Sequence, residues 1–94
     1  MKIKELYDSE DKWTKGSRAR RSDGVSVDEL NPYAASWCLY GAITKCYDKL
    51  EVSKITCIIY KYIKEKFNED AITIFNDYVA KFKDIKKMVE ILDI

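Results

Sequence analysis

The stretch Ala35-Ser-Trp-Cys-Leu-Tyr-Gly-Ala42 decides the fold that the sequence predicts. It follows Asn31-Pro32, which is a helix start signal, because Asn caps free N–H groups and Pro at the first helical position needs no N–H of its own. A helix is therefore expected from Pro32 to about Lys49. Gly41 lies inside it at a cost of about 1 kcal/mol relative to alanine, so we expect another part of the molecule to approach the helix closely there.

This expected helix has one apolar face and one side that packing alone does not explain. With about 100° of rotation per residue, the apolar face consists of Ala35, Leu39, Ala42, Ile43, Cys46 and Leu50. Trp37 and Gly41 lie on the opposite side. Small residues there would let a neighbouring helix pack closely, and the same dent would accept a flat ligand or a partner side chain, with Trp37 and Tyr40 as stacking surface. Both interpretations stay open.

The segments before this stretch are expected to form a short helix and a loop. Residues 3–13 place Ile3, Leu6 and Tyr7 on one side of a helix, and Trp13 lies where this apolar stripe would continue. Residues 14–31 contain two glycines and no apolar run of helical period, which predicts a loop or a small hairpin with a short strand at residues 25–27.

Two more helices are expected after it. Residues 51–67 form an amphipathic helix whose apolar stripe is Val52, Ile55, Ile59, Tyr62 and Ile63. Residues 71–75 form a short helical turn or an edge strand. Asp84 is a plausible cap of the last helix, whose apolar positions are Ile85, Met88, Val89 and Leu92.

Length and periodicity together predict a mainly α, single-domain fold over residues 1–94. A chain of 94 residues buries roughly 65% of its unfolded surface, which is enough for a modest core without a metal or a disulfide. We expect a small bundle of about four helices with a long basic loop and a minor β hairpin.

Composition argues against several classes of function. The chain has no histidine, the usual general base and zinc ligand, and its three cysteines lack C-x-x-C spacing. Neither a metal site nor a cofactor is expected. The N-terminal residues show no apolar signal region, and the longest apolar run is too short to cross a bilayer, so the expected location is cytoplasmic without a membrane partner. A sequence pI of about 7.6 argues against nucleic acid as a partner.

A basic segment lies in the expected loop. Lys15, Arg18, Arg20 and Arg21 follow Lys12, and no carboxylate interrupts the set up to residue 22. A glycine-containing turn can aim N–H groups at a phosphate while arginines bind it bidentately. A solvated basic loop explains the same residues about as well.

Two further features have a structural and a functional interpretation. Cys38 lies in the central stretch, but a catalytic thiol needs a lowered pKa and a base beside it, and there is no histidine to serve. Asn76-Asp77 is first a turn signal, and second a polar anchor for a ribose or a similar group.

Several of these features resemble one known family. They are Trp13-x-x-Gly16, Ala19, Gly24, the aromatic-Cys-x-x-Gly-Ala core of residues 37–42, and Phe75-Asn-Asp77 before a closing amphipathic helix. The chain resembles the domain of unknown function six-one-nine-seven, which occurs in bacteriophages and bacteria, from Trp13 to Leu92. The basic loop departs from the family pattern. The resemblance implies no settled activity, but its phage distribution suggests an accessory protein that disarms a host defence by sequestering a nucleotide-derived signal.

The sequence thus predicts a non-enzymatic protein that binds a small phosphorylated or nucleotide-like ligand, as a homo-oligomer because a small subunit rarely encloses a ligand alone. One alternative is a helical interaction module whose exposed Trp37 face docks on a host protein. The least favoured is a small enzyme acting on a nucleotide signal. The expected ligand-binding residues are Trp13, Lys15, Gly16, Arg18, Arg20, Arg21, Trp37, Tyr40, Gly41, Asn76 and Asp77.

Overall fold

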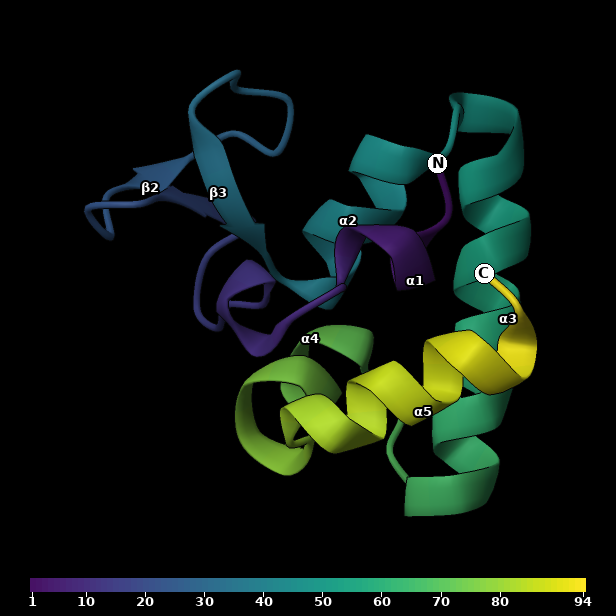
Figure 1. Cartoon of the computed structure of the whole chain (residues 1–94). Helices are drawn as coiled ribbons and strands as arrows, with labels where there is room; N and C mark the ends of the chain where they lie inside the picture. Colours follow the sequence, from purple (N-terminus) through teal and green to yellow (C-terminus); the bar gives the residue numbers. More distant parts are fainter.

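The structure, a computed structural model, describes residues 1–94 and consists of helices with a small sheet at one side (Figure 1). In chain order the elements are α1 (Ile3–Leu6), the 3-10 helix η1 (Glu10–Lys12), β1 (Ala19–Arg21), β2 (Ser26–Val27), β3 (Ala34–Trp37), α2 (Leu39–Cys46), α3 (Lys49–Phe67), α4 (Ile72–Ile74), the π-helix η2 (Phe75–Val79) and α5 (Phe82–Leu92).

The sheet and the long helices lie on opposite sides of the molecule. Figure 1 shows the sheet on one side, α3 on the other, and α1 and α2 between them, while α5 crosses α3. The strands are antiparallel in the order β2-β1-β3, with Ala19 paired to Val27 on one side and to Trp37 on the other. The predicted mainly α fold is therefore confirmed in its helices, but the three-stranded sheet makes the fold mixed.

The prediction of a helix from Pro32 to Lys49 is wrong for the first half of this range. Asn31 does cap a turn, since its Oδ1 accepts a hydrogen bond from the N–H of Tyr33 at 2.8 Å, but the chain then becomes strand β3. Pairing with β1 explains this outcome, because strand partners distant in sequence override a local start signal. The helix begins only after Cys38.

That helix is also shorter than expected at its end. It stops at Cys46, and Asp48 starts α3 by accepting hydrogen bonds from the N–H groups of Leu50 and Glu51, both at 3.0 Å. Leu50 therefore belongs to the first turn of α3 and is 90% exposed, so its assignment to the apolar face was wrong. Leu39, Ala42 and Ile43 of the same face are buried as predicted.

The N-terminal segments follow the expected pattern with shorter elements. The helix expected over residues 3–13 ends at Leu6 and is followed by η1, yet Ile3, Leu6 and Tyr7 are buried as predicted. Residues 14–31 contain the predicted hairpin, with β2 inside the expected short strand.

In the C-terminal half, the structure differs from the prediction mainly in where the helices begin. Residues 72–74 form the short helical turn α4, but Asn76-Asp77 lies inside η2 and not in an isolated turn. The last helix begins at Phe82, so Asp84 is its third residue, and its Oδ2 accepts from the N–H of Lys81 at 2.9 Å. The buried stripe of α3, Ile55, Ile59 and Ile63, is confirmed.

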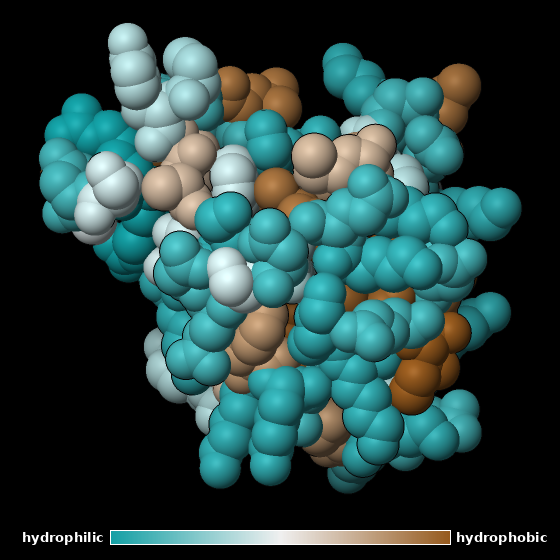
Figure 2. Space-filling view, viewed as in Figure 1, coloured by the Kyte–Doolittle hydropathy of each residue, from teal (hydrophilic) through white to brown (hydrophobic).

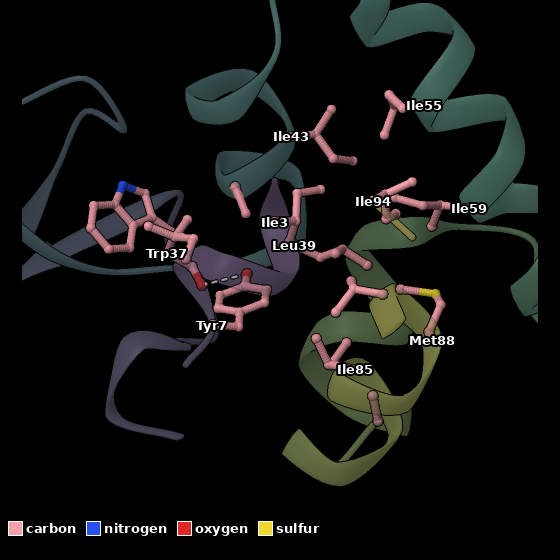
Figure 3. Packing of buried hydrophobic residues seen from close by; sticks show 14 of the residues in the cluster. Ile3, Tyr7, Trp37, Leu39, Ile43, Ile55, Ile59, Ile85, Met88 and Ile94 are labelled. Carbon is pink, nitrogen blue, oxygen red and sulfur yellow. Dashed lines mark hydrogen bonds between the residues drawn. The ribbon is translucent and has the colours of Figure 1, made fainter. Parts of the chain in front are cut away.

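The core joins residues of α1, β1, β3, α2, α3, η2 and α5 into one cluster (Figure 3). Tyr7 is fully buried, and its hydroxyl donates to the carbonyl of Trp37 at 2.9 Å. Burial raises the pKa of this phenol well above its ordinary value. Because this bond ties the end of α1 to the end of β3, it fixes the sheet against the helices.

The surface in Figure 2 is mostly hydrophilic, with separate small apolar areas. No helix in the structure combines the length and the apolar character needed to cross a membrane.

Candidate functional site

A polar cleft lies where the start of the hairpin meets α2 and the α4–η2 segment. Its volume is about 220 Å³. Four of the residues expected to bind a ligand line it, namely Gly16, Arg18, Tyr40 and Asp77. The other lining residues, Ser17, Cys38 and Thr73, add two hydroxyls and a thiol.

A larger apolar groove adjoins this polar cleft, because Tyr40 and Thr73 line both. The groove runs between α3 and the α4 segment and has a volume of about 600 Å³. The two hollows together fall in the range of small-molecule sites, about 300–1,000 Å³. Its remaining lining residues are Val52, Ser53, Thr56, Cys57, Tyr60, Asp70 and Ile72.

Gly16 and Asp77 shape one wall of the polar cleft. Gly16 has a φ of +76°, a backbone conformation that side chains disfavour. Its N–H donates to Asp77 Oδ1 at 3.1 Å, which fixes the carboxylate at the edge of the cleft. The second oxygen of Asp77, Oδ2, accepts no hydrogen bond from the protein and is free for a ligand.

Arg18 and Tyr40 form another part of the lining. The guanidinium carbon of Arg18 lies 4.8 Å from the centre of the Tyr40 ring, and its Nη1 donates to Glu29 Oε1 at 3.3 Å. Glu29 is buried, with a side chain only 8% exposed, whereas that of Arg18 is 51% exposed. Arg18 is thus anchored at one edge, and its remaining N–H groups donate to no protein acceptor.

Gly41 lies against the backbone of Arg18. A Cβ at Gly41 would be 2.1 Å from the carbonyl oxygen of Arg18, and the same oxygen accepts from the N–H of Cys38 at 3.1 Å. The predicted close approach is confirmed, but the neighbour is the backbone of Arg18, just before β1, and not another helix. Gly41 therefore lies against the backbone of Arg18 without lining the cleft itself.

Cys38 caps α2 within the polar cleft. Its Sγ accepts a hydrogen bond from the N–H of Gly41 at 3.3 Å. Burial raises the pKa of the thiol, although the backbone N–H groups of Gly41 and Tyr40 act in the opposite direction. Because a nucleophilic cysteine needs a lowered pKa, this thiol is suited to capping and packing.

Trp37 is a core residue. It is 7% exposed, and its Nε1 donates to the carbonyl oxygen of Glu29 at 3.0 Å. Of the interpretations left open for Trp37, the structure supports the core position, and the expectation of an exposed Trp37 face was wrong. Pairing of β3 with β1 turns this side chain inward, which a helical projection of the sequence does not describe.

Asn76, expected as a turn signal or a polar anchor, is a buried residue whose side chain joins several segments of the chain by hydrogen bonds. It is 1% exposed. Its Oδ1 accepts from Trp13 Nε1 at 2.7 Å and from the N–H of Leu39 at 3.0 Å, and its Nδ2 donates to the carbonyl of Thr14 at 3.1 Å and to Asp77 Oδ1 at 2.9 Å. These four bonds use the full hydrogen-bonding capacity of the amide. One of them also fixes the indole of Trp13 against Asn76.

The basic residues of the loop do not line one common cavity. Arg18 alone lines the polar cleft. Lys15 lies with its Nζ 5.1 Å from the centre of the Trp13 ring, and Arg20 and Arg21 line a different cavity. The expected site is thereby divided into two parts.

Ser17, Thr73 and Glu29 are the residues near the cleft that sequence reasoning missed. Ser17 follows Gly16 directly, so a glycine-containing turn could have indicated it. Thr73 and Glu29 gave no signal, because each reaches the site through tertiary contacts.

No group of three or more cysteine or carboxylate side chains is arranged to hold a metal ion. Comparison of the chain with models of known families, with curated protein sequences and with solved structures found no match. The family resemblance described above stays a prediction.

Proposed function

We propose that the protein is a non-enzymatic binding protein for one small nucleotide-like ligand, seated in the polar cleft and extending into the apolar groove. The observation that carries this proposal is the convergence of Arg18, Tyr40 and Asp77, from three separate segments, on one hollow. A positive fork, an aromatic ring and a carboxylate are suited to an anionic group, a flat ring and a hydroxyl group.

Both parts of the lining have unused hydrogen-bonding capacity. Arg18 has N–H groups directed to no protein acceptor, so it can bind an anionic oxygen. Asp77 Oδ2 can accept from a ribose hydroxyl, while its Oδ1 stays bonded to Gly16. The apolar groove, reached past Tyr40, gives a base or another apolar ring a place to lie.

The charges favour a ligand with one phosphoryl group. Arg18 is the one cation that lines the polar cleft, and Asp77 places a carboxylate in the same hollow. A chain of phosphates would meet this carboxylate and the buried Glu29 without further cations to balance them. This replaces the expectation that four basic residues hold the phosphates together.

Sequestration is the biological role that agrees with such a site. The Cys38 thiol in the cleft has a raised pKa and the chain has no histidine, so we expect the ligand to be held and returned unchanged. The family resemblance adds the expectation of a phage accessory protein that withdraws a host signal, and of a homo-oligomer that covers the open side of the cleft.

The test uses adenosine 5′-monophosphate, guanosine 5′-monophosphate, adenosine and inorganic phosphate as probes. Thermal shift and calorimetric titration are measured, and the bound compound is released by heat and identified by mass spectrometry. We expect a monophosphate to raise Tm more than either of its parts and to return unaltered. No retained compound and no thermal shift with any probe would overturn the proposal, and an altered compound would show an enzyme instead.

Two conservative variants localise the binding. Asp77→Asn keeps an Oδ1 acceptor for Gly16 but replaces the free acceptor with a donor, and Arg18→Lys keeps a charge beside Glu29 but removes the planar fork. Each is expected to weaken binding about tenfold, because a hydrogen bond to a charged group contributes about 1.5–3 kcal/mol. Lys61→Gln, at an exposed position on α3, is the control and should bind normally.

A further inference from the structure

A second cavity, here called the hairpin cavity, lies between η1 and the strands β1 and β3. It has a volume of about 370 Å³ and shares no lining residue with the polar cleft. Its lining residues are Asp11, Lys12, Arg20, Arg21, Ser22, Gly24, Ala35 and Ser36.

Arg20 is held rigidly at this cavity by neutral acceptors. Its Nε donates to Thr14 Oγ1 at 3.1 Å, its Nη1 to the carbonyl of Gly24 at 3.1 Å, and its Nη2 to the carbonyl of Lys15 at 3.0 Å. A guanidinium has five N–H donors, so two remain. The loop thereby fixes the guanidinium in place and leaves two of its N–H groups without a protein acceptor.

Arg20 is the arginine, among the three in the chain, that forms no ion pair with a carboxylate. Arg18 pairs with Glu29 at 3.3 Å, and Arg21 pairs with Asp23 at 2.5 Å. Arg20 has no carboxylate within 4.0 Å, the limit for an ion pair. Part-buried cations in proteins are usually paired, so a fixed and unpaired guanidinium is suited to an anion from outside the chain.

We propose that the hairpin cavity binds an oxyanion of the phosphate type, with Arg20 as its central ligand. A tetrahedral oxyanion offers two adjacent oxygens to the planar fork of an arginine. Lys12, whose Nζ lies 3.4 Å from Asp8 Oδ1, adds a second cation at the edge of the cavity, and Ser36 adds a hydroxyl. Ser36 is paired with Arg20 across the sheet, which puts both side chains on the same face.

Three carboxylates limit the strength of this site, and one of them, Asp8, pairs with Lys12. Asp11 lines the cavity, and Asp23 occupies the guanidinium of Arg21 through two hydrogen bonds, at 3.1 and 2.5 Å. Removing the charge of Asp23 should therefore free Arg21 for the oxyanion. In Asp23→Asn the new Oδ1 still accepts from the N–H of Val25, which keeps the turn intact.

The experiment is a titration with inorganic phosphate followed by amide NMR shifts, at constant ionic strength kept with chloride. We expect saturable shifts at residues around the hairpin cavity. Lys12→Gln should weaken binding about twofold to fivefold and Asp23→Asn should strengthen it by a similar factor, since an exposed charge pair contributes about 0.2–1 kcal/mol. Lys61→Gln, which removes one exposed lysine on α3, should bind as the wild type does.

Arg20→Lys completes the set, with the fold checked by circular dichroism. A folded variant is expected to lose the saturable shifts, because an ammonium cannot replace the bonds to Thr14, Gly24 and Lys15 and still present a fork. If this variant does not fold, the opposite responses of Lys12→Gln and Asp23→Asn decide the matter. Shifts that do not saturate, that change equally in Lys61→Gln, or that fall only on the polar cleft would overturn the proposal. Since the two hollows share no lining residue, Asp77→Asn should leave this binding unchanged.

Discussion

The carbonyl oxygen of Arg18 occupies the place where a side chain on Gly41 would begin. A Cβ there would lie 2.1 Å from that oxygen, and 3.0 Å from the carbonyl carbon of the same residue. Both atoms belong to backbone that also accepts a hydrogen bond from Cys38. The segment that carries Arg18 into the polar cleft is therefore positioned by the absence of a side chain on α2.

Gly41→Ala should destabilise the protein by about 3 kcal/mol, because overpacking against backbone costs this much and a flexible side chain is not there to move away. The sign is diagnostic, since alanine is favoured over glycine by about 1 kcal/mol in an ordinary helix interior. Urea unfolding measures the change. Ser53→Ala on the exposed surface of α3 is the control, and it should stay within about 0.5 kcal/mol of the wild type. A neutral or stabilising Gly41→Ala would contradict the contact.

Asn76→Asp should be destabilising by about 3 kcal/mol at neutral pH. The substitution replaces the amide donor to Thr14 and Asp77 with a second acceptor, and it buries a carboxylate 2.9 Å from the Asp77 carboxylate. The loss should shrink in acid as the new carboxyl becomes protonated. Asn31→Asp is the matched control, because Asn31 only accepts through Oδ1 from Tyr33, which an aspartate does equally well. Equal effects of the two substitutions, measured by urea unfolding at pH 7, would show that the Asn76 side chain does not join these segments.

Asp93 should make stability depend on pH in the acid range. Hydrogen bonds from Lys4 and then Lys2 lower the pKa of its carboxyl from 3.8 to about 2. A folded pKa below the unfolded one means that the contribution is present above about pH 4 and is lost as the pH falls through about 2. The test compares the urea midpoints of the wild type and Asp93→Asn from pH 6 to pH 2. Asparagine tolerates the left-handed backbone at this position, where φ is 54°. The gap between the two proteins should be constant above pH 4 and should close towards pH 2, and a gap that widens in acid would refute the assignment.

Cys57 should be alkylated first among the three cysteines. It is exposed, whereas Cys38 and Cys46 are partly buried, and burial raises the pKa of both of those thiols. Iodoacetamide labelling followed by peptide mass spectrometry gives the order. Because Cys57 lines the apolar groove, a bound nucleoside monophosphate should slow its labelling by about the fraction of sites filled. Slower labelling of Cys46 alone would place the ligand elsewhere, since Cys46 lines neither hollow.

The candidate site was predictable from the sequence only in part. Gly16, Arg18, Tyr40 and Asp77 were singled out as ligand-binding residues, and they do meet in one cleft. Arg20 and Arg21 were expected beside Arg18, but both lie in β1 and line a separate cavity together with residues of η1 and β3. The register shift between Arg20 and Arg21 interrupts the usual alternation of side chains, and a loop assignment predicts neither the strand nor this irregularity.

Local pattern determined the elements whose partners lie nearby in the chain. The buried stripe of α3, the apolar face of α5 and the hairpin follow from spacing, because period and turn residues act within a few positions. Gly41 inside the expected helix also predicted that another part of the molecule approaches this helix closely. Only the tertiary structure decided what approaches it, that Ala34–Trp37 is a strand, and that Trp37 is buried. Those outcomes depend on pairing with β1 and on contacts between residues far apart in the chain, whose free energy exceeds the local preference for a helix after Asn31-Pro32.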